Sequence, residues 1–90
     1  MGDKLIAANI LPNLKGFHYI VDAVLDYNAH TPVMIIYDRV ANAHKTTRAN
    51  VWRSIQHAKE KSEVYKKYSN TEFIALLRWE LERWERERSS

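Results

Sequence analysis

The sequence predicts an all-α fold, a single compact five-helix domain that spans residues 1–90. Gly and Pro occur only twice each, which disfavours a β fold rich in turns. Apolar residues make up 46% of the chain and aromatic residues 11%, as in a folded domain. The apolar residues recur at helical spacing, and 90 residues suffice for one modest core.

The first two helices are expected at residues 3–10 and 14–28. Asp3 lies near the start of the first helix and Pro12 lies beyond its end. The second helix carries apolar residues at i, i+3, i+4 and i+7, so one side of it should face the core. This stripe consists of Leu14, Phe17, Ile20, Val21, Val24 and Leu25.

A third helix is expected at about residues 32–44, with Thr31 as its N-cap and Pro32 as its first residue. The apolar run 33–37 taken alone resembles a strand. Residues 38–43 continue it in helical period, which favours the helix.

The fourth helix is expected at about residues 47–67, because Thr46 and Thr47 are both suitable N-caps. Its inner side is predicted from spacings of three and four residues, and comprises Val51, Ile55, Ala58 and Ser62. The side chains that then point away from the core or flank it are Arg48, Ala49, Asn50, Trp52, Arg53, Gln56 and His57.

The fifth helix is expected at about residues 70–88, because Ser69 and Glu72 have the spacing of a capping box. Ile74, Leu77, Leu81 and Trp84 follow at a and d spacing. We expect the first half of this helix to close the core. The second half offers either a homodimer contact through Trp79, Leu81 or Trp84, or a charged tail in water.

Positive charge is concentrated in the middle of the chain. Residues 39–67 hold eight Lys or Arg and two Glu, a net charge of +6, whereas the whole chain carries +3. Such a concentration of positive charge is typical of a surface that binds phosphates, although a solvent-exposed helix face can carry the same charge.

Residues 34–61 are predicted to form two helices joined by a tight turn. Such a helix-turn-helix could place the second helix in the DNA major groove. Arg, Asn and Gln side chains match the edges of guanine and adenine, and hydroxyls and amides at a helix start suit a phosphate. The predicted DNA contacts are Lys45, Thr46, Thr47, Arg48, Asn50, Trp52, Arg53, Gln56, His57 and Lys59.

Trp52 has three interpretations. It could contact a thymine methyl group or the sugar-phosphate backbone, or anchor a protein interface, where Trp is enriched. It could instead fold back onto the last helix and be partly buried.

Three blocks of sequence carry a family resemblance. They are LKGFHY at 14–19, the pattern of Thr46, Thr47, Val51, Arg53, Ile55, His57 and Ala58, and NTEFIA at 70–75. With these blocks the chain resembles the C-terminal DNA-binding effector domain of the sporulation-initiation response regulator of endospore-forming bacteria. The resemblance implies an all-helical domain that binds DNA, often as tandem copies on repeated short boxes. It implies a positioning helix at 34–44, a recognition helix at 47–66, and a DNA-contacting role for Arg53.

The chain also departs from that family. Asn50, Trp52 and Gln56 stand where the family has Arg, Glu and Arg, so we expect a different DNA box. The segment 63–69 is much shorter than its counterpart. The phosphoacceptor receiver domain that precedes the family's effector domain has no room in 90 residues, so we expect either an isolated effector domain or a stand-alone, divergent relative. The natural-looking Met start and the divergent recognition face favour the stand-alone relative.

Other classes of function are disfavoured. The chain has no Cys for disulfides or thiolate metal sites, and no run of about 18 apolar residues to span a membrane. Its four His show no metal-ligand spacing, and no catalytic motif occurs. We therefore expect no enzyme activity, cofactor, metal or small-molecule substrate, and a cytoplasmic location in bacteria, on the nucleoid when bound.

The function that the sequence predicts is sequence-specific binding of double-stranded DNA by a transcription regulator. The alternative is a protein-interaction module that keeps the fold and binds or inhibits a protein partner, such as a related regulator.

Overall fold

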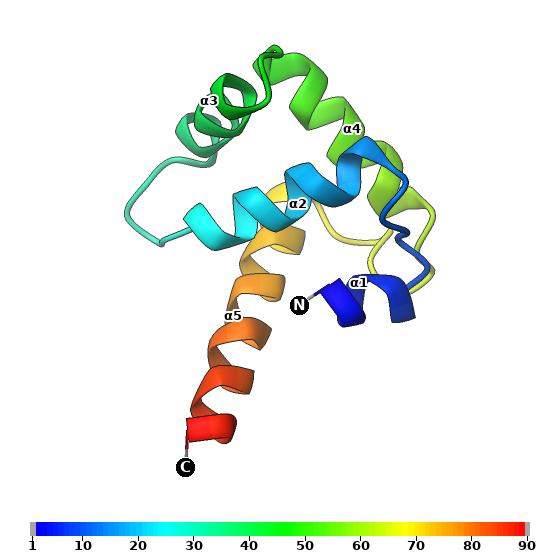
Figure 1. Cartoon of the computed structure of the whole chain (residues 1–90), viewed down its shortest axis with the longest axis vertical. Coiled ribbons are helices and arrows are strands. Elements are labelled where there is room, and N and C mark those ends of the chain that lie inside the picture. Colours follow the sequence, from blue (N-terminus) through cyan, green and yellow to red (C-terminus); the bar gives the residue numbers. More distant parts are fainter. Residues whose placement is uncertain (1, 90) are drawn as a thin grey trace.

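The computed structural model describes the backbone of residues 2–89 and the side chains of residues 4–88. Within this range the fold is all-helical, as predicted, with no strand. Asp3, expected near the first helix start, has its side chain outside the described residues. The elements are α1 (Gly2–Ala7), α2 (Lys15–Asp26), α3 (Val33–Ala43), α4 (Arg48–Glu60) and α5 (Asn70–Ser89) (Figure 1).

Helix α2 is the central element, since it contacts α3, α4 and α5. Three residues of its predicted stripe, Phe17, Ile20 and Val24, are buried, two more are half-buried against the core, and Leu25 is exposed. Gly16 lies where α2 meets α4, against the carbonyl oxygen of Ser54. The close approach of the two backbones there requires a residue without a side chain.

Residues 44–47 form the short turn between α3 and α4. Lys45 adopts a left-handed conformation with φ of 55°, and the amide of Thr46 donates to the carbonyl oxygen of Ala41 over 2.9 Å. Thr47 is the N-cap of α4, because its hydroxyl accepts a hydrogen bond from the amide of Asn50. The sequence proposed Thr46 or Thr47, and the structure selects Thr47.

Helix α3 begins one residue later than predicted, with Pro32 as its N-cap and no side-chain capping bond. The expected cap, Thr31, instead exchanges hydrogen bonds with the side chain of Asn28. The Thr31 hydroxyl therefore bonds to a loop residue, Asn28, and does not cap α3.

Helix α4 ends at Glu60, so the prediction that it continues to about Lys67 is wrong. The hydroxyl of the buried Ser62 accepts a hydrogen bond from the amide of Tyr65, which favours a turn over a further helical turn. Tyr65 is thereby buried against Phe73 of α5, with ring centroids 5.0 Å apart. The lysines that follow Glu60 lie on this connecting segment and not on α4.

Helix α5 begins as predicted. The amide of Ser69 donates to Glu72 and the amide of Glu72 donates to the Ser69 hydroxyl, which confirms the capping box. The bond from the Ser69 amide, helped by its hydroxyl, lowers the pKa of the Glu72 carboxyl.

The two halves of α5 differ in burial, as expected. Ile74 and Leu77 are buried, Leu81 is half-buried, and Trp79 and Trp84 are exposed. The last turns of α5 extend beyond the other helices (Figure 1). Trp79 and Trp84 are five positions apart, which at about 100° per residue places them on different sides of the helix. Only Leu81 and Trp84 continue the stripe of Ile74 and Leu77.

Candidate nucleic-acid interface

The outer face of α4 is open. Val51, Ile55 and Ala58 are buried as predicted, and so is Ser62 just beyond the helix. The predicted outward side chains are all exposed or half-buried, namely Arg48, Ala49, Asn50, Trp52, Arg53, Gln56 and His57. We call these seven residues the outer face of α4. No described segment of the chain seals this face.

Arg53 lies on the outer face with its guanidinium free. Its side chain is exposed and has no hydrogen bond or ion pair with any described residue. A guanidinium with five donors and no acidic neighbour is well suited to a guanine edge or a phosphate. Arg48 is less free, because it forms an ion pair of 3.6 Å with Asp38 of α3. Both of these side chains are about half exposed, so the pair stabilises the fold little.

The two amide side chains of the outer face are partly engaged. Asn50 donates through Nδ2 to the hydroxyl of Thr46 over 2.9 Å. Gln56 donates through Nε2 to Glu60 over 2.8 Å and accepts from Lys59 over 3.2 Å. To present its amide to a base in place of these partners, Gln56 must break two hydrogen bonds, whereas Asn50 must break one.

Lys59 is wrongly placed among the predicted DNA contacts. It is only 3% exposed, and its ammonium donates to the carbonyl oxygen of Tyr68 and to Gln56. Burial lowers the pKa of the ammonium, and the carboxylates of Glu60 and Glu72 oppose that shift. The connecting segment folds over this side of α4, which local spacing could not reveal.

The turn residues Lys45, Thr46 and Thr47 lie at the start of α4, as predicted. The side chain of Lys45 is exposed and makes no hydrogen bond or ion pair with the described part of the chain. The hydroxyls of Thr46 and Thr47 both accept hydrogen bonds from Asn50 and each keeps its O–H as a donor. Lys45 is the turn residue with a free cationic side chain for a phosphate.

Trp52 borders an apolar groove between α3 and α4. The groove is lined by Met34, Tyr37, Arg48, Ala49, Trp52 and Arg53. Trp52 is 46% exposed, so its side chain is partly buried, and it lines this groove with residues of α3 and α4. Its backbone carbonyl, however, accepts a hydrogen bond from the Asn70 side chain at the start of α5. The buried Tyr37 hydroxyl has no hydrogen-bond partner among the described residues, and burial raises its pKa to about 12.

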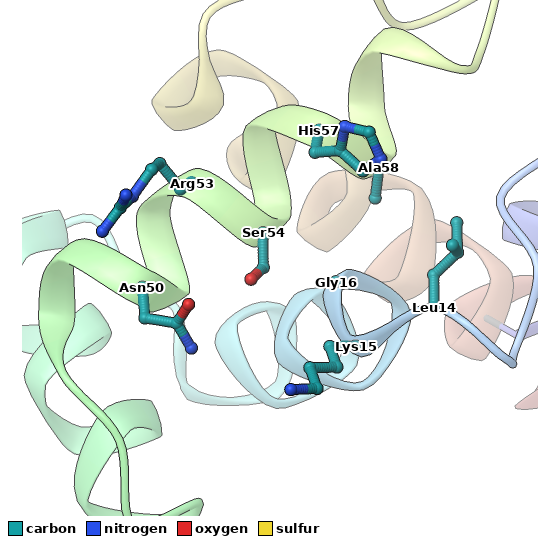
Figure 2. Close-up of a pocket in the computed structure, with 8 residues that line it drawn as sticks. All are labelled: Leu14, Lys15, Gly16, Asn50, Arg53, Ser54, His57 and Ala58. Carbon is teal, nitrogen blue, oxygen red and sulfur yellow. The ribbon is translucent and has the colours of Figure 1, made fainter.

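A second groove lies between the start of α2 and the other side of α4 (Figure 2). It has a volume of about 420 Å³ and is lined by Leu14, Lys15, Gly16, Asn50, Arg53, Ser54, His57 and Ala58. Sequence reasoning missed Lys15 as a site residue. It is far from α4 in the sequence, and only the packing of Gly16 on Ser54 brings it there.

Other kinds of site find little support in the described residues. Residues 4–88 contain no group of three or more His, Asp or Glu side chains placed to hold a metal ion. None of the helices within residues 2–89 has the length and apolar character needed to cross a bilayer. The chain matches no known protein family, no curated protein and no solved structure. Its function is therefore inferred from the residues of the site.

Proposed function

We propose that this protein is a transcription regulator that binds double-stranded DNA, with α3, the turn and α4 acting as a helix-turn-helix and α4 entering the major groove. The observation that carries the proposal is the open outer face of α4, at whose centre Arg53 is exposed and unpaired. The short turn at 44–47 and the free Lys45 beside it support the same proposal.

The residues of the outer face have separate roles in this proposal. Arg53 and Asn50 contact base edges, and Ala49 offers a methyl group to thymine. Lys45 contacts the phosphate backbone at the start of α4, and Arg48 joins it by exchanging Asp38 for a phosphate. Gln56 reads bases only after it releases Glu60 and Lys59. The resemblance to the sporulation regulator's effector domain supports DNA binding, while Asn50, Trp52 and Gln56 favour a different box.

A salt titration tests the proposal. The chain is mixed with a fluorescently labelled duplex of random sequence, and affinity is measured by anisotropy at increasing KCl. We expect the logarithm of the association constant to fall linearly with the logarithm of salt, with a slope of about −0.9 per neutralised phosphate. No binding at low salt, or an affinity that does not depend on salt, would contradict DNA binding.

A second candidate function is recognition of a protein partner, and the apolar groove beside Trp52 favours it. Exposed Met34 and Trp52 flank this groove, and Trp often anchors protein interfaces. In that case the same face would bind or inhibit a partner such as a related regulator. The salt titration separates the two candidates, because only the first requires release of counterions from a duplex.

A homodimer is part of the DNA-binding proposal. Leu81 and Trp84 continue the buried stripe of α5 beyond the core, where Trp84 is 51% exposed. Pairing two copies through this stripe would bury Trp84 and present two α4 helices to one duplex. Selection of bound fragments from a random duplex pool should then recover paired half-sites about 10 bp apart, or a multiple of that spacing. Recovery of single, unpaired half-sites would contradict the dimer.

A further inference from the structure

We propose that the groove between the start of α2 and α4 holds one phosphate of the DNA backbone, with Lys15 as its principal cation and with Arg53 and His57 in its lining. This inference rests on the proposed function and deepens it, because it adds a contact from a helix outside the helix-turn-helix. The ligand is a phosphodiester of the duplex and not a free anion.

The composition of the groove favours an anion. Three of its lining residues, Lys15, Arg53 and His57, carry positive or protonatable side chains, and none of the lining residues is acidic. These three are exposed, and none of them has a hydrogen bond or ion pair with another described residue. Most other Lys and Arg side chains of the described range have an acidic or aromatic partner, for example Lys4 with Glu80 and Arg39 with Asp26. Two unpaired cations, Lys15 and Arg53, therefore line this groove, and the unpaired Lys45 lies at the turn before α4.

The geometry brings Lys15 of α2 to the side of α4 that lines the groove. Gly16 packs against the carbonyl of Ser54, which holds the first turn of α2 directly against α4. Figure 2 shows Lys15 and Asn50 pointing toward one another across the mouth of the groove, with Ser54 pointing toward Gly16. The first turn of α2 has no side-chain cap and no acidic residue, so the positive end of the helix dipole adds to the field of the side chains.

The position of the groove favours a phosphate of the duplex. Asn50 and Arg53 line the groove and also belong to the outer face of α4. A duplex whose bases meet this face would run its backbone along the edge of α4, where Lys15 lies. The groove is open to the surface, and a backbone phosphate can enter it without leaving the strand.

The experiment compares two substitutions that each remove one lysine charge. Lys15→Gln changes the groove, and Lys4→Gln changes an exposed lysine on α1 that pairs with Glu80 of α5. Affinity of the full chain for a random duplex is measured by anisotropy over a KCl series, and thermal unfolding confirms that both variants fold. We expect Lys15→Gln to weaken binding several-fold at low salt and to flatten the salt slope by about one phosphate. Lys4→Gln should match the wild type.

Each result supports or overturns the inference. If the wild type does not bind the duplex at low salt, both this inference and the proposed function fail. If the wild type binds and Lys15→Gln behaves as Lys4→Gln does, only the phosphate contact fails. A further arm adds inorganic phosphate in place of chloride at equal ionic strength. If phosphate displaces the duplex more strongly than chloride does, and Lys15→Gln removes that difference, the free anion and the duplex compete for the groove, which supports the inference.

Discussion

Replacing Gly16 by Ala is expected to lower the free energy of unfolding by about 3 kcal/mol. A Cβ atom at this position would lie 2.3 Å from the carbonyl oxygen of Ser54 and 2.7 Å from the Cβ of Ala58. The first neighbour is backbone and the second is the only side-chain atom of its residue, so neither can rotate away. Helices α2 and α4 must therefore separate at their main contact, which disrupts packing in the core.

The predicted change in stability has the opposite sign to that expected for Gly→Ala at an exposed helical position. At an exposed helical position, Gly→Ala would stabilise the protein by about 1 kcal/mol, because Ala has the higher helix propensity. Urea denaturation followed by circular dichroism measures the difference. Lys15→Ala is the matched control on the same turn, since Lys15 is exposed and its replacement should change stability by less than about 0.5 kcal/mol. A Gly16→Ala variant as stable as the wild type would show that the two backbones do not meet as described.

Replacing Arg53 by Ala is expected to weaken specific DNA binding by about 1–3 kcal/mol while leaving the fold intact. The guanidinium is exposed and makes no intramolecular bond within the described residues, so its loss removes nothing from the folded state. Binding loses either a bidentate contact to guanine or a contact to a phosphate. The measurement is anisotropy with a duplex recovered from the random pool, together with thermal unfolding of the variant.

The control for Arg53 is Arg83→Ala, which removes an exposed arginine from the far half of α5, where it pairs with Glu87. This control should bind as the wild type does. A duplex changed at a single base pair adds a second test. If Arg53 contacts a guanine, replacing that base pair should weaken DNA binding by the wild type but not by Arg53→Ala. If Arg53 contacts a phosphate, every base-pair change should cost the variant as much affinity as it costs the wild type. Equal affinity of Arg53→Ala and Arg83→Ala would remove Arg53 from the interface.

Much of the fold follows from interactions between residues that are close in the sequence. The capping box of Ser69 and Glu72 and the N-cap at Thr47 each depend on a spacing of three residues. The inner side of α4 depends on spacings of three and four. Such features can be predicted from one sequence, because helix geometry alone brings the residues that form them together.

The site could be predicted only in part, because local spacing determines the exposure of some of its residues but not of others. Exposure of Arg53 follows from its angular position on α4 relative to Val51 and Ile55. Lys59 has a similar charge and lies on the same helix, yet the carbonyl of Tyr68 removes it from the surface. That contact depends on how the chain turns after Glu60, where the buried Ser62 ends the helical pattern.

By itself, the sequence determined the five helices, most of their limits and the apolar sides of α2, α4 and α5, because these depend on neighbours within about one helical turn. The tertiary structure alone decided where α4 stops, that Lys59 is covered, that Trp84 is exposed beyond the core, and that Lys15 lines a groove with residues of α4. Each of these four facts depends on segments distant in the chain, whose meeting is set by the packing of one helix on another and not by local periodicity.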